Sequence, residues 1–567
     1  MRLKRLFLGI MLSAGIANIG AANYIPENVS ISLKVPGNDA QHYSLTLQKQ
    51  QDGVYTCQSS EQLPLVITRQ VVDKDGKQRI NVVITALDTV YFNYGEQINT
   101  GYRHSDCQFY MPGFWYRQNL RSPEKAPSFH TSDSWLVRED RLSSPLTAAF
   151  NSSKGKSMSV IRIDKFDKEA LATHKEGEVI VSGETSIGYT GFENIGGMTV
   201  LSYGFPYKEA PKTYIRKLTL APSVEAFQLL RKGDSITLSW ELSEIDASDF
   251  SECVQRTWEY CYDTNRPQPV NTPYTVDRMK DVLSNFFVES YVNTTPTHYY
   301  SGVELKTATC ASTDVAEVGF VGRTLLNAFN ALEYGFQHNR PELVNSANSI
   351  FDTYLSNGFS PAGFFNEVVH YNRDFKESNL SIRRQSEGVY AILNYLAYEK
   401  QYKRKHPEWE NRLKVILDSF LRLQNADGSF PRKFKDDFSI VDGTGGSTPS
   451  ATLPLVMAYK YFKDKRYLES AKRTVDYLEN ELISKSDYFS STLDANCEDK
   501  EASLYAATAT YYLALVTKGA ERAHYAELCR KAAYFALSWY YTWDVPFAEG
   551  QMLGDIGLKT RGWGNVS

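Results

Sequence analysis

The sequence predicts a two-part fold, an N-terminal β-sandwich followed by a toroid of paired α-helices. Short segments of alternating polar and apolar residues, bounded by turn residues, fill the chain to about residue 243. Beyond residue 275 the apolar residues recur at helical spacing. The loops between these helices alternate between short and long, as expected when helices pair and the pairs pack side by side around a core.

Eight helices are predicted in four pairs, preceded by a helix near 276–292. Loops within a pair are short, whereas loops between pairs run to roughly 17–24 residues, well above the usual length between packed helices. Long loops are generally functional, and here all of them fall on one face of the array, so we expect the site on that face. The paired helices cover residues 316–338 and 341–357, 381–402 and 408–424, 448–462 and 466–483, and 501–517 and 521–541.

The two helices of a pair differ in composition. Leading helices such as 450–462 are apolar or small nearly all round, which is typical of buried helices. Trailing helices such as 409–423 carry apolar residues at i, i+3, i+4 and i+7 with charges between them, which indicates a one-sided surface helix. The leading helices are therefore predicted to be inner, with their unpaired N–H groups and positive dipole ends directed at the long-loop face.

The loop Leu423–Phe430 (LQNADGSF) resembles the Q-x-x-D-G-x-aromatic loops of the six-hairpin glycosidase-like (α/α)6-toroid carbohydrate-active enzymes. The same residues also suit a plain turn. With the helix pairing, the resemblance covers residues 270–567 and implies a carbohydrate substrate; an N-terminal β-sandwich beside the toroid occurs in several such families. Four pairs fall short of six, so we expect a toroid truncated at its C-terminus or lacking a helix.

The first 22 residues have the pattern of a secretory signal peptide. Arg2, Lys4 and Arg5 precede an apolar run, and small residues lead to a cleavage site near Ala22. The pattern predicts a bacterial protein that is periplasmic or secreted. No later stretch is apolar enough to span a membrane, and the net charge of −4 gives no indication of nucleic-acid binding.

The domains are predicted as signal peptide 1–22, β-sandwich 23–243, linker 244–274 and catalytic toroid 275–567. The Asp-Gly signal in Asp73–Lys77 predicts a hairpin. Seven cysteines fit no zinc spacing and leave disulfide pairing open. Strands are predicted at 29–35, 42–48, 63–71, 78–85, 89–94, 157–163, 178–182 and 235–242.

One stretch of the sandwich region lacks a strand pattern. Arg, His, Asp and Trp crowd without period in residues 101–117 and 129–141. We expect either a loop that closes over the toroid mouth or a polar interface between the domains. Arg103 and His104 are the substrate-binding candidates here.

The chemistry is expected from the titratable residues of the long loops, because no catalytic triad, phosphate loop or metal motif appears. We expect no cofactor and no metal. The candidate substrate-binding residues on these loops are Glu367, His370, Tyr371, Arg383, Arg384, Asp499 and Trp563.

Asp442 and Glu498 are the predicted catalytic pair, because glycoside hydrolysis needs two carboxylates across the scissile bond. Glu498, next to Cys497, is the predicted acid, with its pKa raised by burial. Asp442 lies among glycines that let backbone approach a ligand, and it is the predicted base. Acids in the first turn of a helix are also ordinary stabilisers.

Arg383 and Arg384 are unusual because cations disfavour a helix N-terminus. Binding a uronate carboxylate or sulfate would account for them, and so would an ion pair with Glu387. The sequence therefore favours a glycoside hydrolase that acts on a polysaccharide or oligosaccharide, including uronate-containing ones. A polysaccharide lyase with Tyr371 or His370 as base is the alternative, and a non-catalytic glycan-binding protein is the second.

Overall fold

The structure is a computed structural model that describes residues 25–58, 63–171, 176–216, 218–269, 271–301, 314–320, 322–371, 378–489 and 497–565. The predicted signal peptide lies outside these residues, as do part of the loop before α5 and part of the loop before α9. None of the described helices is long and apolar enough to cross a membrane.

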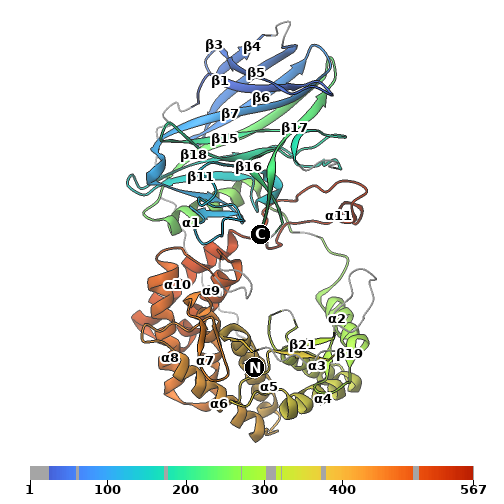
Figure 1. Ribbon diagram of the computed structural model, residues 1–567, viewed down its shortest axis with the longest axis vertical. Coiled ribbons are helices and arrows are strands. Elements are labelled where there is room, and N and C mark those ends of the chain that lie inside the picture. Colours follow the sequence, from blue (N-terminus) through green and yellow to red (C-terminus); the bar gives the residue numbers. More distant parts are fainter. Residues whose placement is uncertain are drawn as a thin grey trace.

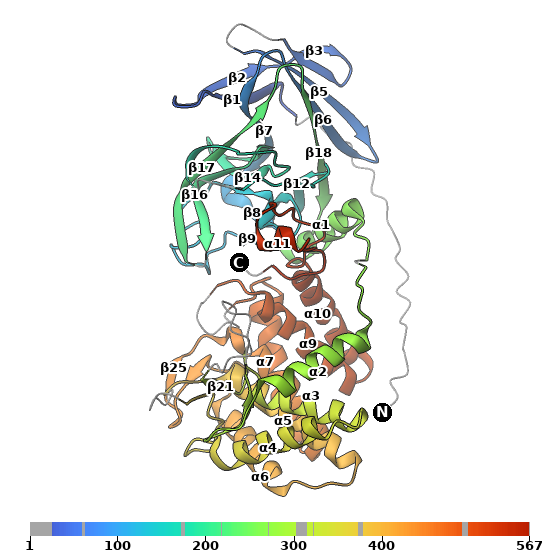
Figure 2. The ribbon, with the colours of Figure 1, turned by 90° about the vertical axis from the view of Figure 1, so that its right-hand side faces the viewer.

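Two nine-stranded sheets form the N-terminal part (Figures 1 and 2). The first has the order β13 (Gly177–Ile180), β17 (Thr219–Leu230), β16 (Lys208–Arg216), β10 (Trp135–Arg138), β14 (Tyr189–Ile195), β15 (Met198–Phe205), β7 (Val90–Arg103), β1 (Asn28–Lys34) and β2 (Gln41–Thr46). The second has the order β3 (Gln48–Gln51), β4 (Val54–Cys57), β5 (Leu65–Lys74), β6 (Lys77–Ala86), β18 (Ser235–Asp246), β12 (Lys156–Arg162), β11 (Leu146–Asn151), β8 (Cys107–Met111) and β9 (Trp115–Arg117).

The inner faces of the two sheets share one hydrophobic core. Tyr94 of β7 stacks on Trp240 of β18 with ring centroids 6.4 Å apart, and both are buried. The predicted hairpin joins β5 to β6, where Lys74 pairs with Lys77. Its central residues Asp75 and Gly76 have φ values of 54° and 77°, as the tight turn requires.

The stretch predicted to be an irregular loop over the toroid mouth is instead built into the sheets. β7 continues to Arg103, a 3₁₀ turn covers His104–Asp106, and β8, β9 and β10 follow. The crowded aromatic residues pack inward, where Trp115 and Trp135 are fully buried. The expected polar interface is present nearby, because Arg117 at the end of β9 reaches the helical part.

The predicted linker contains a sixteen-residue helix, α1 (Phe250–Asn265). The Asp249 side chain caps it by accepting a hydrogen bond from the Glu252 N–H at 2.8 Å. α1 packs against β11, β12 and β18 on one side and α10 on the other, so it joins the two parts of the molecule. Cys253 and Cys261 both lie on α1 as free thiols.

The helical part is an arc of four hairpins (Figure 1). The inner helices contact one another in the order α3, α5, α7, α9, and each is followed by its outer partner. The hairpins are α3 (Thr324–Gln337) with α4 (Pro341–Asn357), α5 (Ile382–Gln401) with α6 (Pro407–Leu423), α7 (Pro449–Phe462) with α8 (Lys465–Tyr477), and α9 (Lys500–Val516) with α10 (Gly519–Leu537). α2 (Val276–Ser290) lies at the end of the arc next to α3 and α4. The described helices do not close this arc into a ring.

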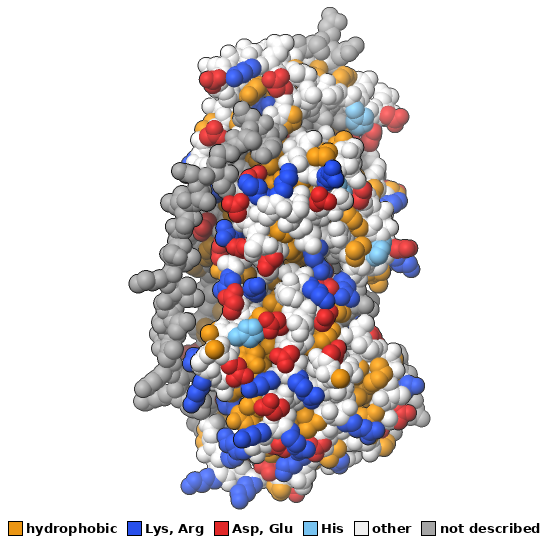
Figure 3. All heavy atoms as spheres, turned by 90° about the vertical axis from the view of Figure 1, so that its left-hand side faces the viewer, with side chains coloured by type: hydrophobic (Ala, Val, Ile, Leu, Met, Phe, Trp, Pro, Cys, Tyr) orange, Lys and Arg blue, Asp and Glu red, His pale blue; other side chains and the backbone are white. Residues whose placement is uncertain are grey.

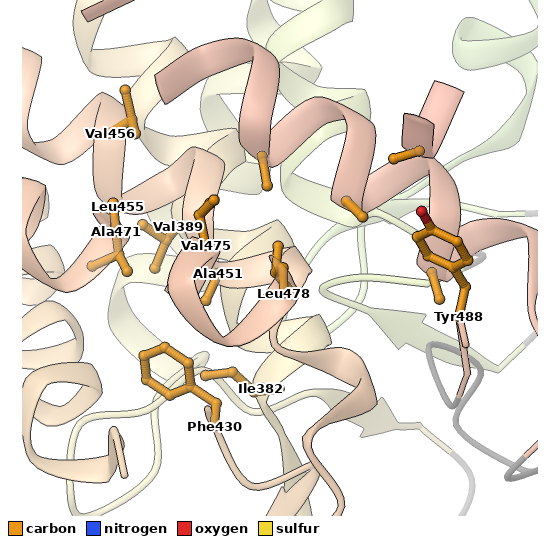
Figure 4. Packing of buried hydrophobic residues seen from close by; sticks show 14 of the residues in the cluster. Ile382, Val389, Phe430, Ala451, Leu455, Val456, Ala471, Val475, Leu478 and Tyr488 are labelled. Carbon is orange, nitrogen blue, oxygen red and sulfur yellow. The ribbon is translucent and has the colours of Figure 1, made fainter. Parts of the chain in front are cut away.

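Burial separates inner from outer helices as the sequence predicts. Only one residue of 450–462 is exposed, whereas 409–423 alternates between buried and exposed positions. Figure 4 shows Val389 of α5, Leu455 of α7 and Val475 of α8 in one packed cluster. Figure 3 shows the left-hand side of Figure 1, where α8 and α10 lie, and this face carries charges of both signs.

The first predicted helix begins later than expected. Residues 315–317 form strand β21 (Val315–Glu317), which pairs with β22 (Val368–His370), and α3 begins at Thr324. Figure 2 places β21 and β25 (Ile440–Asp442) on the same side of the helices, where the long loops gather. β25 pairs with β24 (Lys433–Phe434), which pairs with β23 (Leu380–Ser381). A further pair is β19 (Tyr291–Val292) with β20 (Tyr299–Tyr300).

The segment after α10 returns to the sandwich. Trp543 donates a hydrogen bond from its indole to the Leu142 carbonyl at 3.0 Å, and Ser144 bonds Thr542 at 2.7 Å. The short helix α11 (Met552–Asp555) completes this segment.

Candidate functional site

A cavity of about 200 Å³ lies between the four inner helices. Glu387 and Tyr390 of α5, Tyr505 of α9 and Arg323 at the start of α3 supply polar atoms to its lining. α7 contributes Pro454, which has no N–H to donate to the helix carbonyl four residues earlier. The cavity therefore combines apolar helix surface with a few converging polar groups, as ligand sites do.

Glu387 is the carboxylate of this cavity, and several donors converge on it. Its two oxygens accept hydrogen bonds from the Phe320 N–H and the Tyr505 hydroxyl. The Arg383 Nε lies 3.3 Å away and an Arg323 nitrogen 3.6 Å away. Burial, together with the charge of Glu387, raises the pKa of Tyr505 well above its usual value.

Arg383 bridges two carboxylates. Its side chain is 1% exposed, and besides Glu387 it contacts Glu501 of α9 at 2.6 Å. Glu387 and Glu501 thus lie on opposite edges of one guanidinium. The positive charge of Arg383 at the start of α5 is therefore balanced by these two acids. Glu387 lies one turn further along the same helix.

Arg384 faces acidic residues of its own chain. It contacts Glu317 at 2.9 Å and Glu367 at 3.8 Å. Glu367 is buried, and burial raises its pKa to about 7, although hydrogen bonds from Ser381 and Gln385 and the charge of Arg384 oppose the rise. A role for Arg384 or Glu367 in binding substrate stays a prediction.

Tyr371, the candidate base of the lyase alternative, lies in surroundings that disfavour loss of its proton. Its hydroxyl donates to the Thr297 carbonyl, and its ring stacks on Tyr299 at 4.9 Å. Burial raises the pKa of Tyr371 to about 12, whereas a base at neutral pH needs a lower value. The neighbouring His370 lies in β22 and pairs with Val315 of β21.

Glu498 lies at the junction with the sandwich. Its side chain is 3% exposed and contacts Arg117, which also binds Asp487 at 2.7 Å. Burial raises the pKa of Glu498 to about 8 even though Arg117 opposes the rise, the direction predicted for an acid. The cavity that Glu498 lines has a volume of only about 40 Å³, which leaves no room for a sugar ring. Asp499 caps α9 by accepting from the Glu501 N–H at 2.8 Å.

Asp442 holds a turn at the end of β25. It accepts hydrogen bonds from the Thr444 N–H at 2.9 Å and from Arg432 at 2.9 Å. Burial alone would raise the pKa of Asp442, but these donors lower it, the direction predicted for a base. The contacts of Asp442 and Glu498 are with different groups, and neither residue lines the central cavity.

Two of the three glycines that follow Asp442 lie against other parts of the chain, whereas the nearest atom to a side chain at Gly443 would be 3.9 Å away. A side chain at Gly445 would meet the Tyr477 hydroxyl at 2.2 Å, and one at Gly446 would meet the Phe489 carbonyl at 2.2 Å. These two glycines therefore permit close packing within the chain itself.

The remaining candidates are dispersed. His104 is buried in the sandwich and stacks on Phe129 at 5.8 Å, so it is a core residue and not a substrate contact. Arg103 is exposed at the end of β7. Trp563 is 61% exposed in the C-terminal segment.

Sequence reasoning identified Glu387 as an ion-pair partner but missed its place in the cavity, and it missed Tyr505 and Arg323. One signal for Glu387 was available, namely a carboxylate within residues 386–398 of α5, which are otherwise apolar or small nearly all round. Among the described residues, no group of His, Cys, Asp or Glu is arranged to hold a metal ion.

No protein-family model matches the chain, and no curated protein matches it. Similar solved structures are carbohydrate-active enzymes. A polysaccharide lyase is 9% identical with a TM-score of 0.34 and covers 92% of this chain and 86% of its own. A cellobiose 2-epimerase from Bacillus thermoamylovorans is 12% identical with a TM-score of 0.38, over 52% of this chain and 76% of its own.

The unsaturated glucuronyl hydrolase from Bacillus sp. GL1 is 14% identical with a TM-score of 0.31, over 42% of this chain and 67% of its own. TM-scores below 0.5 do not assign a shared fold, and we draw neither fold nor activity from these likenesses.

Proposed function

We propose that this chain is a carbohydrate-active enzyme, a glycoside hydrolase whose substrate enters the cavity between the inner helices. The supporting observation is Glu387, a carboxylate that lines this cavity and is held by Tyr505, Arg383 and the Phe320 N–H. Hydrolysis of a glycosidic bond needs such a fixed carboxylate and a second one across the bond. A cavity of about 200 Å³ has room for about one sugar ring.

Glu501 is the proposed second carboxylate. Its side chain is 34% exposed, and Arg383 links it to Glu387, so the positions of the two acids are coupled. Both oxygens of Glu387 accept hydrogen bonds, which hold this carboxylate in a fixed position. Asp442 and Glu498 stay the competing catalytic pair, supported by the opposite directions of their pKa shifts.

We further propose that the substrate contains a uronate. Arg323 lines the cavity with a side chain that is 42% exposed, and it approaches Glu387 only to 3.6 Å. A guanidinium in this position can bind a sugar carboxylate through two parallel hydrogen bonds. The leader-like first 22 residues support action in the periplasm or outside the cell.

The lyase alternative is disfavoured for a tyrosine base, whereas His370 stays the other candidate base. Burial raises the pKa of both Tyr371 and Tyr505, which opposes proton abstraction at neutral pH. The test is incubation with a panel of uronate-bearing oligosaccharides, with new reducing ends and absorbance of unsaturated product recorded together. New reducing ends without absorbance support hydrolysis, absorbance identifies a lyase, and neither signal with retained binding identifies a glycan-binding protein.

The catalytic pair is tested with charge-removing variants of near-identical shape. Loss of activity in Glu387→Gln and Glu501→Gln, with Asp442→Asn and Glu498→Gln active, supports Glu387 and Glu501 as the catalytic pair. The reverse pattern supports Asp442 and Glu498. As a folding control, the unfolding midpoint of each of the four variants at pH 7 is compared with that of the parent. The midpoints should differ by no more than the removal of one charge accounts for.

A further inference from the structure

A second cavity, of about 450 Å³, lies in the sandwich part of the molecule. Its walls are the end of β10 with the turn Glu139–Arg141, strand β16, and residues 545–551 of the C-terminal segment. It shares no lining residue with the cavity between the inner helices. Nothing in the proposed hydrolysis uses it.

One edge of this cavity is built from ion pairs. Arg138 donates to both oxygens of Asp140, at 3.0 and 2.7 Å, and lies 3.4 Å from Glu169. The Arg141 guanidinium donates to both oxygens of Glu209, the second contact at 3.0 Å. The Arg138 guanidinium also covers the Tyr207 ring at 3.9 Å.

The charges of the cavity disfavour an anionic ligand. Its two arginines, Arg138 and Arg141, face three carboxylates, those of Asp140, Glu169 and Glu209. Burial raises the pKa of Glu169 to about 7, so the net charge is either zero or −1 near neutral pH. No cation of this lining is left over to compensate a bound uronate, sulfate or phosphate.

The paired groups keep hydrogen-bonding capacity for hydroxyls. A carboxylate has about four lone-pair sites and a guanidinium five N–H donors, and a bidentate pair uses only two of each. Donors and acceptors then lie side by side on one edge of the cavity. Hydroxyl groups, which both donate and accept, fit such an edge better than purely anionic or cationic groups do.

The cavity also has apolar lining residues. Val545, Pro546 and Phe547 of the C-terminal segment face it, together with Ile215 of β16. Ile215 is 42% exposed, and the Asp140 and Arg141 side chains are 22% and 24% exposed, so the cavity is open to solvent. Its volume falls in the range of small-molecule sites.

We propose that this cavity is a second carbohydrate site that binds a neutral saccharide unit. The ring hydroxyls of the sugar bond the ion-paired edge formed by Arg138, Asp140, Arg141 and Glu209, and an apolar ring face packs on Phe547 and Val545. The site binds without cleaving, and it holds neutral stretches of a glycan against the sandwich.

The test is binding of neutral tetrasaccharides, namely cellotetraose, xylotetraose and mannotetraose, with tetragalacturonate as the anionic comparison. Calorimetry compares three proteins, namely the parent chain, the variant Ile215→Trp and the control Ile195→Trp. The tryptophan at position 215 fills the mouth of the cavity. Ile195 is 47% exposed on β14 and does not line the cavity. A large side chain at either exposed position leaves the core intact.

We expect at least one neutral tetrasaccharide to bind the parent and the control equally, and Ile215→Trp to weaken that binding tenfold or more. Gln551→Ala, which shortens a second wall residue, should weaken it to a smaller extent. Absence of binding by all three neutral tetrasaccharides would overturn the proposal. Equal binding of the neutral tetrasaccharides by Ile215→Trp and Ile195→Trp would overturn it as well. So would an Ile215→Trp variant that loses only the binding of tetragalacturonate. Both outcomes count whatever the activity of the central cavity.

Discussion

Replacing Glu498 by Gln should remove a large pH dependence of stability. Burial raises the pKa of this carboxyl from its ordinary 4.5 to about 8, so the folded chain holds a proton that the unfolded chain releases. The resulting stabilisation is fully present below about pH 4.5 and is lost as the pH rises through 8. Each pH unit in this window removes about 1.4 kcal/mol, which amounts to about 5 kcal/mol over the whole window.

Gln cannot titrate, so the free energy of unfolding of Glu498→Gln should rise relative to the parent by about 1.4 kcal/mol per pH unit between pH 5 and 8. The measurement is urea unfolding of both proteins at each pH. Other titrating groups are common to both proteins and cancel in the difference. A difference that stays constant to within about 0.5 kcal/mol would refute the buried, proton-binding environment.

Arg117→Ala is the companion variant, because it removes the cation that faces Glu498. Above pH 8, where the carboxyl is ionised, this change should cost about 3 kcal/mol. Below pH 6 the protonated carboxyl needs no counter-charge, so the cost should be smaller. If the loss of stability in Arg117→Ala does not depend on pH, Arg117 stabilises the fold only through packing and through its ion pair with Asp487.

Three further changes test the cavity between the inner helices. Gly319→Ala places a methyl group 2.4 Å from a Glu387 oxygen, so activity should fall by about a hundredfold. In the control Gly443→Ala the methyl group has its nearest neighbour at 3.9 Å, and activity should not change. Tyr371→Phe should keep its rate within about twofold, and an inactive variant would restore the lyase mechanism. Arg323→Ala should raise KM for uronate-bearing glycans by about tenfold and leave neutral ones unchanged, and equal losses on both would exclude a carboxylate contact.

The helix hairpins could be predicted from sequence because their signals are local. α4 was predicted at 341–357 and occupies Pro341–Asn357, where a proline begins the helix and the apolar stripe defines its buried face. α1 was missed, although Asp249 and Glu252 stand at the spacing of a capping box.

Several strands of the sandwich could not be predicted from alternation. All six residues of β11 are buried, as are most of β8, so neither strand has a solvent face that would require polar residues. Strands of this kind are indistinguishable from loops or helix fragments by periodicity alone. Residues 101–117 and 129–141 were therefore interpreted as a loop over the toroid mouth or as a polar interface between the domains.

The residues of the proposed site differ from the acids that the sequence singled out on the long loops. Asp442 and Glu498 stood out as acids on adjacent long loops, yet their structural partners are Arg432 and Arg117. The residues that surround Glu387 come from α5, α9 and the segment before α3. No local sequence pattern encodes contacts between elements so far apart in the chain.

The most direct test of the proposed function is the rate of reducing-end release from uronate-bearing oligosaccharides by the parent and by Glu387→Gln. The variant keeps the shape of the side chain and removes its charge. If Glu387 acts on the substrate, kcat should fall by at least about a thousandfold, since catalytic carboxylates contribute effects of this order. Full activity of a folded Glu387→Gln protein would contradict the assignment of the active site to the cavity between the inner helices.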